Sequence, residues 1–237
     1  MFSDFTCYEK YIPPVAPISL ADLSTQLRIY QDEAIEVWYS PMGVRVAKPK
    51  LWILGITPGW NQVRIAYEEA ANAMASGMSP TQAAQMRKPR VAFAGSMRAN
   101  LITMLDTLGV ATIFDVDSCA QLFESEGLRT GSVLKYPVFK QGKNYTGHSP
   151  KPISHPVLQT MIDQIFADEL QTVGECLILP LGKMVEDVLA YTVDQGWVNP
   201  AQVLTGFPHP SGANGHRHRQ FNENKRALKR AIAKWYK

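Results

Sequence analysis

The chain has 237 residues, of which 46% are hydrophobic and 19% charged, a composition typical of a globular protein with a substantial core. No apolar run approaches the ~20 residues that span a bilayer, and Met1–Lys10 lacks the pattern of a signal peptide, so we expect a cytoplasmic protein with no membrane partner. Cys7, Cys119 and Cys176 are too few and too widely spaced for a disulfide framework or for zinc or iron–sulfur ligation, and no metal or organic cofactor is predicted.

Charge is unevenly distributed along the chain, although the net charge is only +3. From His209 to the end there are eight Lys and Arg residues against Glu223 alone, a balance of +7, whereas the preceding 208 residues carry 16 basic and 20 acidic residues, a balance of −4. A mildly acidic body with a basic C-terminal segment indicates a polyanionic partner. On charge alone, a solvated helix face is the preferred explanation of this segment.

Hydrophobic periodicity predicts the elements of the first half of the chain. Ile18–Val37 is predicted to be a helix capped by Ser19, and Lys50–Ile56 a strand buried on both faces, because its apolar residues run without alternation. Three further helices are expected. One covers 62–74, a second begins after an N-terminal cap at Ser79, and a third covers 98–108 and ends at Gly109.

The second half of the chain alternates between strands and helices. Strands are predicted at 132–138, 176–181 and 203–207, and helices around 157–170, 184–194 and 220–235. This alternation indicates an open, mainly parallel α/β sheet. We therefore predict a single domain over 1–237, a three-layer α/β/α fold with a mainly parallel four-stranded central sheet, on which residues 1–48 pack as an N-terminal helical extension.

Three polar or glycine-rich stretches follow the predicted strands: GITPGWNQ, YPVFKQGKNYTGHSP and FPHPSGANGHRHR. Ligands of open α/β sheets bind outside the carboxyl ends of the strands, so these stretches are candidates for one site. The bend at 55–59 and the segment His209–Gly212 are each weak signals alone, because glycine, proline and a single histidine end many strands for structural reasons. Their occurrence together at opposite ends of an α/β chain is more specific.

The chain resembles the uracil-DNA glycosylase superfamily at these points. That family has a Gly-x-x-Pro-Gly-type loop after its first core strand and a His-Pro-Ser-type loop after its last. Three segments between these loops are also similar to the family: FAGSMRANLITML (Phe93–Leu105), TGSVLKYPV (Thr130–Val138) and CLILPLGKMVEDVL (Cys176–Leu189). In total the resemblance covers roughly residues 50–236. It implies a uracil-DNA-glycosylase-like fold and an enzyme that flips a base out of DNA and hydrolyses its N-glycosidic bond.

The resemblance also implies roles for individual residues. His209 would stabilise the departing base anion and Phe93 would be the stacking platform for the flipped base. Ser211 would hold a phosphate, and Gly59 and Gly212 would let the backbone approach the nucleic acid closely. Further base contacts are expected from Ile56, Pro58, Gly131, Ser132 and Asn144, and further DNA contacts from Trp60, Asn214, His216, Arg217, Arg219 and Lys225.

Two positions depart from the family pattern. Many relatives carry Asp or Asn where this chain has Thr57, whose hydroxyl can orient a water but cannot act as a base near neutral pH. Asn61, Glu68 and Asn144 could each compensate, and the spacing selects none of the three. The family's uracil-reading Asn would fall near Gly131 or Ser132, so we expect the substrate to be a damaged or modified pyrimidine rather than plain uracil, in repair or in defence against phage DNA.

Two other functions remain open at this point. The loss of an acid at Thr57 is also expected of a catalytically weak nucleic-acid-binding protein on the same fold. A Gly/Pro bend between a strand and a helix is equally typical of a small-molecule enzyme acting on a nucleotide or another phosphorylated compound. The expected partner is DNA, double- or single-stranded, and the expected state is a monomer; His155, before a proline at a helix start, is expected to cap the helix or face water.

Overall fold

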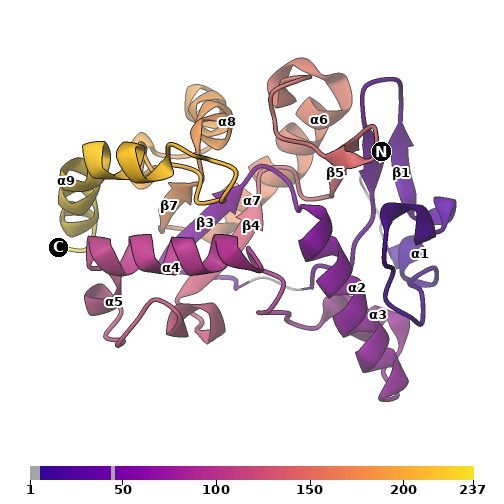
Figure 1. Ribbon diagram of the computed structural model, residues 1–237. Coiled ribbons are helices and arrows are strands. Elements are labelled where there is room, and N and C mark those ends of the chain that lie inside the picture. Colours follow the sequence, from indigo (N-terminus) through magenta and orange to yellow (C-terminus); the bar gives the residue numbers. More distant parts are fainter. Residues whose placement is uncertain (1–5, 44–45) are drawn as a thin grey trace. The chain divides into compact units, whose positions relative to one another are not determined.

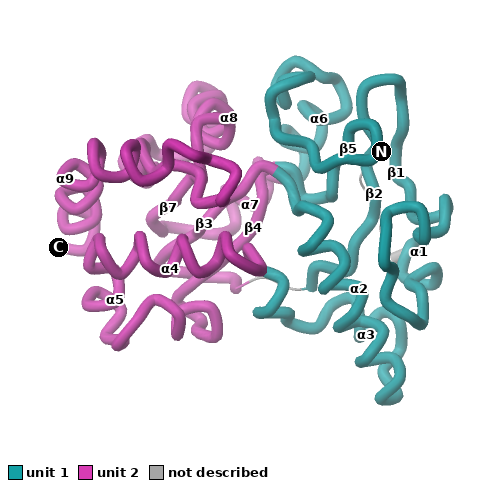
Figure 2. The backbone as a smooth tube through the Cα atoms, in the orientation of Figure 1, with its two compact units in different colours: residues 1–45, 57–92, 134–165 teal, residues 46–56, 93–133, 166–237 magenta. Residues whose placement is uncertain are grey.

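The computed structural model describes residues 6–43 and 46–237, which divide into two units that alternate along the chain (Figure 2). The first unit comprises 1–45, 57–92 and 134–165, and the second comprises 46–56, 93–133 and 166–237. The chain is a mixture of helices and strands, as predicted. That the whole chain, 1–237, forms a single domain stays a prediction. No helix in the described ranges has the length and apolar character needed to cross a membrane.

A three-stranded parallel sheet forms the core of the second unit (Figure 1). Its strands are β3 (Leu51–Gly55), β4 (Leu128–Ser132) and β7 (Leu177–Pro180), in the order β4-β3-β7. All five residues of β3 are buried, as expected of a strand with a neighbour on each side and cover on each face. The predicted strands at 50–56 and 176–181 are thereby confirmed.

The second unit also contains five α-helices, which precede or follow the strands of this sheet along the chain. They are α4 (Ser96–Leu108), α5 (Val110–Ile113), α7 (Ala167–Val173), α8 (Lys183–Asp194) and α9 (Arg217–Trp235). Gly109 ends α4 in the left-handed conformation, with φ 82°, which confirms the predicted stop signal. Short 3-10 turns lie at 121–124 and 200–202.

The predicted fourth parallel strand at 203–207 is wrong. Only Val203 pairs with Ile178 of β7, as an isolated parallel bridge, and Leu204 adds one backbone hydrogen bond to the Ile178 carbonyl. The reason is local: Gly206 has φ 90°, and Pro208 has no N–H to donate to a ladder. The segment continues beside β7 as an irregular loop that leads to His209.

The first unit contains an antiparallel sheet in the order β1-β2-β5-β6. Its strands are β1 (Arg28–Gln31), β2 (Glu36–Trp38), β5 (Val138–Lys140) and β6 (Lys143–Asn144). The helices of this unit are α1 (Thr6–Glu9), α2 (Trp60–Ala75), α3 (Pro80–Gln85) and α6 (Pro156–Met161), with 3-10 turns at 20–22, 25–27 and 152–154. A π-helical segment, Ile162–Phe166, links α6 to α7, so the predicted helix around 157–170 is present with one irregular turn.

The predicted helix Ile18–Val37, and with it a wholly helical N-terminal extension, is wrong. Ser19 does cap a helical turn, but only the 3-10 turn Leu20–Asp22, and the chain then forms β1 and β2. The Asp32 carboxylate accepts hydrogen bonds from the N–H groups of Ala34 and Ile35, each at 2.8 Å, which closes the turn between these two strands.

The predicted strand at 132–138 is also wrong in its bounds. Ser132 is the last residue of β4, and Val138 is the first residue of β5, in a different sheet. Pro137, which has no N–H to donate, interrupts the run immediately before β5. The residues of the predicted strand 132–138 therefore do not form one strand: the first ends β4 and the last begins β5.

Candidate functional site

His209 lies at the carboxyl edge of the parallel sheet. The N–H of Gly182, just after β7, donates to the Phe207 carbonyl at 3.1 Å, which ties the His209 segment to the end of β7. Gly182 has φ 88°, and a methyl group placed on it would lie 3.0 Å from Cβ of His209. Only glycine therefore allows His209 to sit this close to the end of the strand.

The tautomer of His209 follows from its hydrogen bond. Nδ1 accepts from the backbone N–H of Ser211 at 3.3 Å, so the neutral ring carries its proton on Nε2. Burial lowers the pKa of His209 below its usual range, which favours this neutral form. His209 thus presents an uncharged N–H donor at Nε2.

The loop that follows His209 is held by side-chain amides. Nδ2 of Asn214 donates to the His209 carbonyl at 3.1 Å and to Oε1 of Gln220 at 3.0 Å, while Oγ of Ser211 accepts from the Ala213 N–H at 3.1 Å. From α4, Nδ2 of Asn100 donates to the Pro210 carbonyl at 2.8 Å. Both ends of the His209 segment are therefore fixed within the second unit.

Asn100 was not predicted from the sequence. Its only signal is an amide in the middle of a helix, where asparagine has lower propensity than its neighbours. Asn214 was predicted to contact DNA, but its amide is committed to organising the loop.

Phe93 has an unusual backbone conformation. It is a non-glycine residue with φ 50°, and its side chain is buried, with 4% exposed. A methyl group at Gly55, the last residue of β3, would lie 3.5 Å from Cε1 of Phe93 and 3.8 Å from Oγ of Ser132. The ends of β3 and β4 and the Phe93 ring therefore meet at one place. Non-glycine residues in this region are strained, and such strain is concentrated at functional sites.

The predicted base-reading residues Gly131 and Ser132 end β4 next to β3. They pair with Leu54 and Gly55, and Ser132 is 6% exposed. Ile56 follows β3 directly and is half-buried. Neither of these last two residues of β4 has a bulky polar side chain.

Thr57, in the first unit, is a bracing residue. Its hydroxyl donates to the Tyr136 carbonyl at 3.0 Å and accepts from the Val138 N–H at 3.0 Å. Pro58 beside it is buried. The hydroxyl hydrogen is thus used in holding the segment before β5, and it does not remain to position a water.

The bend at Gly59 contacts Asn144 within the same unit. Oδ1 of Asn144 accepts from the Trp60 N–H at 2.8 Å, and the Gly59 N–H donates to Oε1 of Gln62 at 3.2 Å. A methyl group at Gly59 would lie 3.5 Å from Nδ2 of Asn144. Asn61 is exposed on the first turn of α2. The first donors of this helix are therefore occupied by side chains.

The predicted DNA-contacting cations Arg217, Arg219 and Lys225 lie on α9. Arg217 donates from Nη1 to the Asn214 carbonyl at 3.3 Å, and Arg219 lies 3.8 Å from Glu223, an ion pair whose side chains are 69% and 63% exposed. Lys225 is half-buried, and Gly212 and His216 are exposed. The helix buries Phe221, Leu228 and Ile232 and exposes Arg226, Lys229, Arg230 and Lys234. The exposed side of α9 is therefore cationic and its buried side apolar.

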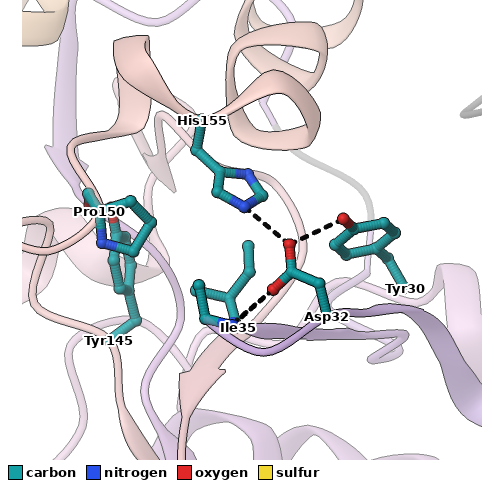
Figure 3. Close-up of polar contacts among 7 residues, drawn as sticks. Tyr30, Asp32, Ile35, Tyr145, Pro150 and His155 are labelled. Atoms are coloured by element: carbon teal, nitrogen blue, oxygen red, sulfur yellow. Dashed lines mark hydrogen bonds and ion pairs between the residues drawn. The ribbon is translucent and has the colours of Figure 1, made fainter.

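A polar cluster that the sequence did not predict lies in the first unit (Figure 3). Oδ2 of Asp32 lies 2.9 Å from Nε2 of His155 and accepts from the Tyr30 hydroxyl at 2.8 Å. His155 occupies the expected N-cap position of α6, but its side chain makes no cap; it is 8% exposed, so the alternative expectation that it faces water is wrong. Its Nδ1 is buried and finds no partner among the described residues.

Asp32 is ionised over the whole physiological range. Burial acts to raise its pKa, but hydrogen bonds from the Ile35 N–H, the Tyr30 hydroxyl, the Ala34 N–H and His155 hold the pKa at about 2. The cluster therefore fastens the β1–β2 turn to the start of α6.

The predicted residues thus gather in groups inside each unit. In the second unit His209, Ser211 and Asn214 form one group and Phe93, Gly131 and Ser132 another, both at the carboxyl edge of the parallel sheet. In the first unit Thr57 contacts the segment before β5, and Gly59 and Trp60 contact Asn144. Within 6–43 and 46–237, no three His, Cys, Asp or Glu side chains are placed to hold a metal ion.

Comparison with known proteins finds a relative in Bacillus subtilis (strain 168), the protein called "Uncharacterized protein YoxB". It is 42% identical over 241 residues, a match that covers 98% of this chain and 94% of the relative. No protein-family model matches the chain.

Proposed function

This chain belongs to the family of YoxB from Bacillus subtilis, and we propose that it is a DNA glycosylase with a uracil-DNA-glycosylase-like fold. The proposed substrate is a damaged or modified pyrimidine in DNA, removed by hydrolysis of its N-glycosidic bond. The proposed fold is a single three-layer α/β/α domain, in which the isolated Val203 bridge takes the place of a fourth strand.

The observation that carries the proposal is the state of His209. Breaking the bond between the sugar and the base leaves its electron pair on the base and positive charge on the sugar. A neutral imidazole donating from Nε2 to a base oxygen stabilises this anion without a proton transfer. The Ser211 N–H at Nδ1 and the lowered pKa of His209 both favour that form.

The surroundings of Phe93 support a base pocket at the same sheet edge. An aromatic ring held beside the ends of β3 and β4 offers a surface on which a flipped base stacks. Gly131 and Ser132, in place of a large polar reader, leave room for a substituent on the pyrimidine ring. At 4% exposure the ring must be uncovered before a base can reach it, so we include a local opening in the proposal.

Binding to DNA is assigned to the exposed cations of α9. Lys and Arg contacts to phosphates are independent of sequence and weaken as salt rises, because bound counterions are released. The proposed protein acts as a monomer.

The test is a panel of labelled duplexes carrying uracil, oxidised pyrimidines or 5-substituted pyrimidines, with abasic sites detected by alkaline cleavage. We expect cleavage of a modified pyrimidine, and a loss of about 10²–10³-fold in rate for His209→Ala, the usual cost of removing one preorganised donor. His218→Ala is the matched control, because His218 is exposed on the first turn of α9. Equal rates for the two variants would refute the role of His209, and release of uracil alone would refute the substrate.

A catalytically weak DNA-binding protein is the second candidate. It is favoured by Thr57, whose hydroxyl is bonded to Tyr136 and Val138 where relatives of the proposed superfamily carry an acid or amide. Gel shifts with the same duplexes distinguish the two functions, because a binder retards DNA without forming abasic sites on any of them. A phosphate-binding enzyme is less well supported, since the N–H groups of Gly59 and Trp60 already have side-chain partners.

A further inference from the structure

The β5–β6 hairpin of the first unit and its neighbouring segments carry charge of one sign. From 134 to 162 the chain has no Asp or Glu but four lysines, which are Lys135, Lys140, Lys143 and Lys151. The stretch therefore carries +4, more than the net charge of +3 of the whole chain. None of these lysines belongs to the residues assigned to catalysis, base contact or DNA contact.

Two of the four lysines face each other across the hairpin turn. Gln141 and Gly142 form a two-residue turn, with φ 50° and 72°, and Lys140 pairs directly with Lys143. Directly opposite residues of an antiparallel pair project on the same face, where like charges destabilise the pair. Both residues of β6 are exposed. An anion bound beside the two ammonium groups would relieve their repulsion.

A third lysine is held beside the hairpin by the loop that follows β6. Nζ of Lys140 donates to the Ser149 carbonyl at 3.0 Å, two residues before the exposed Lys151. Three lysines therefore gather around the turn. We call them the hairpin lysines: Lys140, Lys143 and Lys151.

The charge of the hairpin lysines is not balanced by neighbouring acids. Among the described residues of the first unit, no ion pair includes a hairpin lysine. In β2, the strand next to β5, the acidic residue Glu36 lies 3.6 Å from Nη1 of Arg28. The hairpin lysines therefore form a positively charged surface that suits an external polyanion.

An aromatic residue adjoins this surface. The N–H of Trp60 donates to Oδ1 of Asn144 in β6 at 2.8 Å, and the Trp60 ring meets the ring of Phe139 in β5 edge-on, with 6.4 Å between centroids. Trp60 is half-buried, so part of it faces solvent. Cations that contact phosphates and an aromatic ring on which a base stacks are the two parts of a site for a single nucleic-acid strand. A duplex keeps its bases stacked inside, so it can use the cations but not the ring.

We propose that the hairpin lysines and Trp60 bind a single strand of nucleic acid, with its phosphates against the lysines and an unpaired base on the indole. These residues belong to the first unit, whereas the cations of α9 belong to the second. The inference does not depend on the proposed glycosylase activity, because it concerns the binding of DNA that holds no damaged or modified base. Lysines on an exposed edge strand also discourage pairing with other chains, and that role alone predicts no binding of a strand.

The experiment is fluorescence anisotropy of the full-length protein with a short labelled oligothymidylate. An abasic oligonucleotide of the same length, which keeps the phosphates and lacks the bases, is the matched ligand. Lys143→Gln combined with Lys151→Gln should weaken the binding of both strands about tenfold at low salt. It should also reduce the slope of log K against log salt by roughly 1.4, because each phosphate contact to a single strand contributes about 0.7.

Variants of Trp60 test the stacking of a base. Trp60→Leu should weaken oligothymidylate binding about tenfold and leave binding of the abasic strand unchanged, since only the former offers a base to the ring. Trp60→Phe keeps an aromatic ring and should retain most of the oligothymidylate affinity.

Lys10→Gln combined with Lys48→Gln is the matched control, because it removes the same charge from two exposed lysines outside the hairpin and its loop. It should leave the affinity for both strands unchanged. The lysine variants change exposed side chains, so they test the proposal even if Trp60→Leu fails to fold. Equal losses in the hairpin and control pairs, no binding of oligothymidylate by the parent protein, or tighter binding to phosphatidylserine vesicles than to oligothymidylate would each overturn the proposal. A loss by Trp60→Leu that is as large on the abasic strand as on oligothymidylate would do the same.

Discussion

Replacing Gly182 by alanine should damage both the stability of the protein and the placement of His209. Gly182 has φ 88° and ψ 168°, a backbone region that costs a residue with a side chain about 1–3 kcal/mol. Alanine also loses less chain entropy on folding, which returns about 0.4–1 kcal/mol. The conformational part of the change is therefore about 1–2 kcal/mol.

The close contact adds to this cost. The new methyl group would meet Cβ of His209 at 3.0 Å and its backbone N at 3.4 Å, and such overpacking typically costs about 1–3 kcal/mol. We expect a total loss of about 2–5 kcal/mol in the free energy of unfolding. A displacement of His209 by about 1 Å would lower the rate of the proposed glycosylase reaction on the order of 10²-fold.

Gly174→Ala is the matched control. Gly174 has φ 75° and ψ −159°, in the same backbone region of the same unit, but nothing lies within 4 Å of a methyl group there. Urea denaturation and abasic-site formation should show a loss of about 1–2 kcal/mol with unchanged activity for this variant. If the two variants lost equal stability and both kept full activity, the argument from the His209 contact would be wrong.

Three other predictions follow from the described contacts. Thr57→Val should lower the free energy of unfolding by about 1–3 kcal/mol, because it leaves two backbone groups unpaired, whereas Thr57→Ser should stay close to the parent protein in the same urea titration. The depressed pKa of Asp32 contributes stability that is complete above pH ~4 and is lost as pH falls towards about 2; the shift from 3.8 is worth about 2.4 kcal/mol at most, and roughly 1 kcal/mol after allowance for the exposure of Asp32. Asp32→Asn should therefore flatten the pH dependence of unfolding between pH 4 and 2, and an unchanged slope would contradict the assignment. Replacing Arg226, Lys229 and Arg230 by alanine should reduce the slope of log K against log salt for DNA binding by about 2–3, and an unchanged slope would place the DNA elsewhere.

Elements whose apolar pattern or end residues lie within the element itself could be predicted from the sequence. The continuous apolar run of β3 was enough to predict a buried strand. Ser79 caps α3 as predicted, in a capping box with Gln82, and Gly109 ends α4 as predicted. These signals act within three or four residues, so no distant part of the chain is needed to recognise them.

Long-range contacts decided the elements that were predicted wrongly. Residues 18–37 have an apolar spacing that a helix could use, but Asp32 bonds His155, 123 residues away, and closes a turn between strands instead. The run 132–138 is divided because Ser132 pairs with Gly55 of β3 while Val138 pairs with Val37 of β2. Neither partner can be identified from the apolar pattern of the segment itself.

The same division holds for the candidate sites. The sequence by itself determined the order of strands and loops that draws attention to His209, and the charge that gathers in α9. Only the tertiary structure decided the tautomer of His209, the strained backbone of Phe93, and the burial of Nδ1 of His155 without a hydrogen-bond partner among the described residues. Protonation, strain and burial depend on which atoms surround a group, and chain folding brings those atoms from distant parts of the sequence.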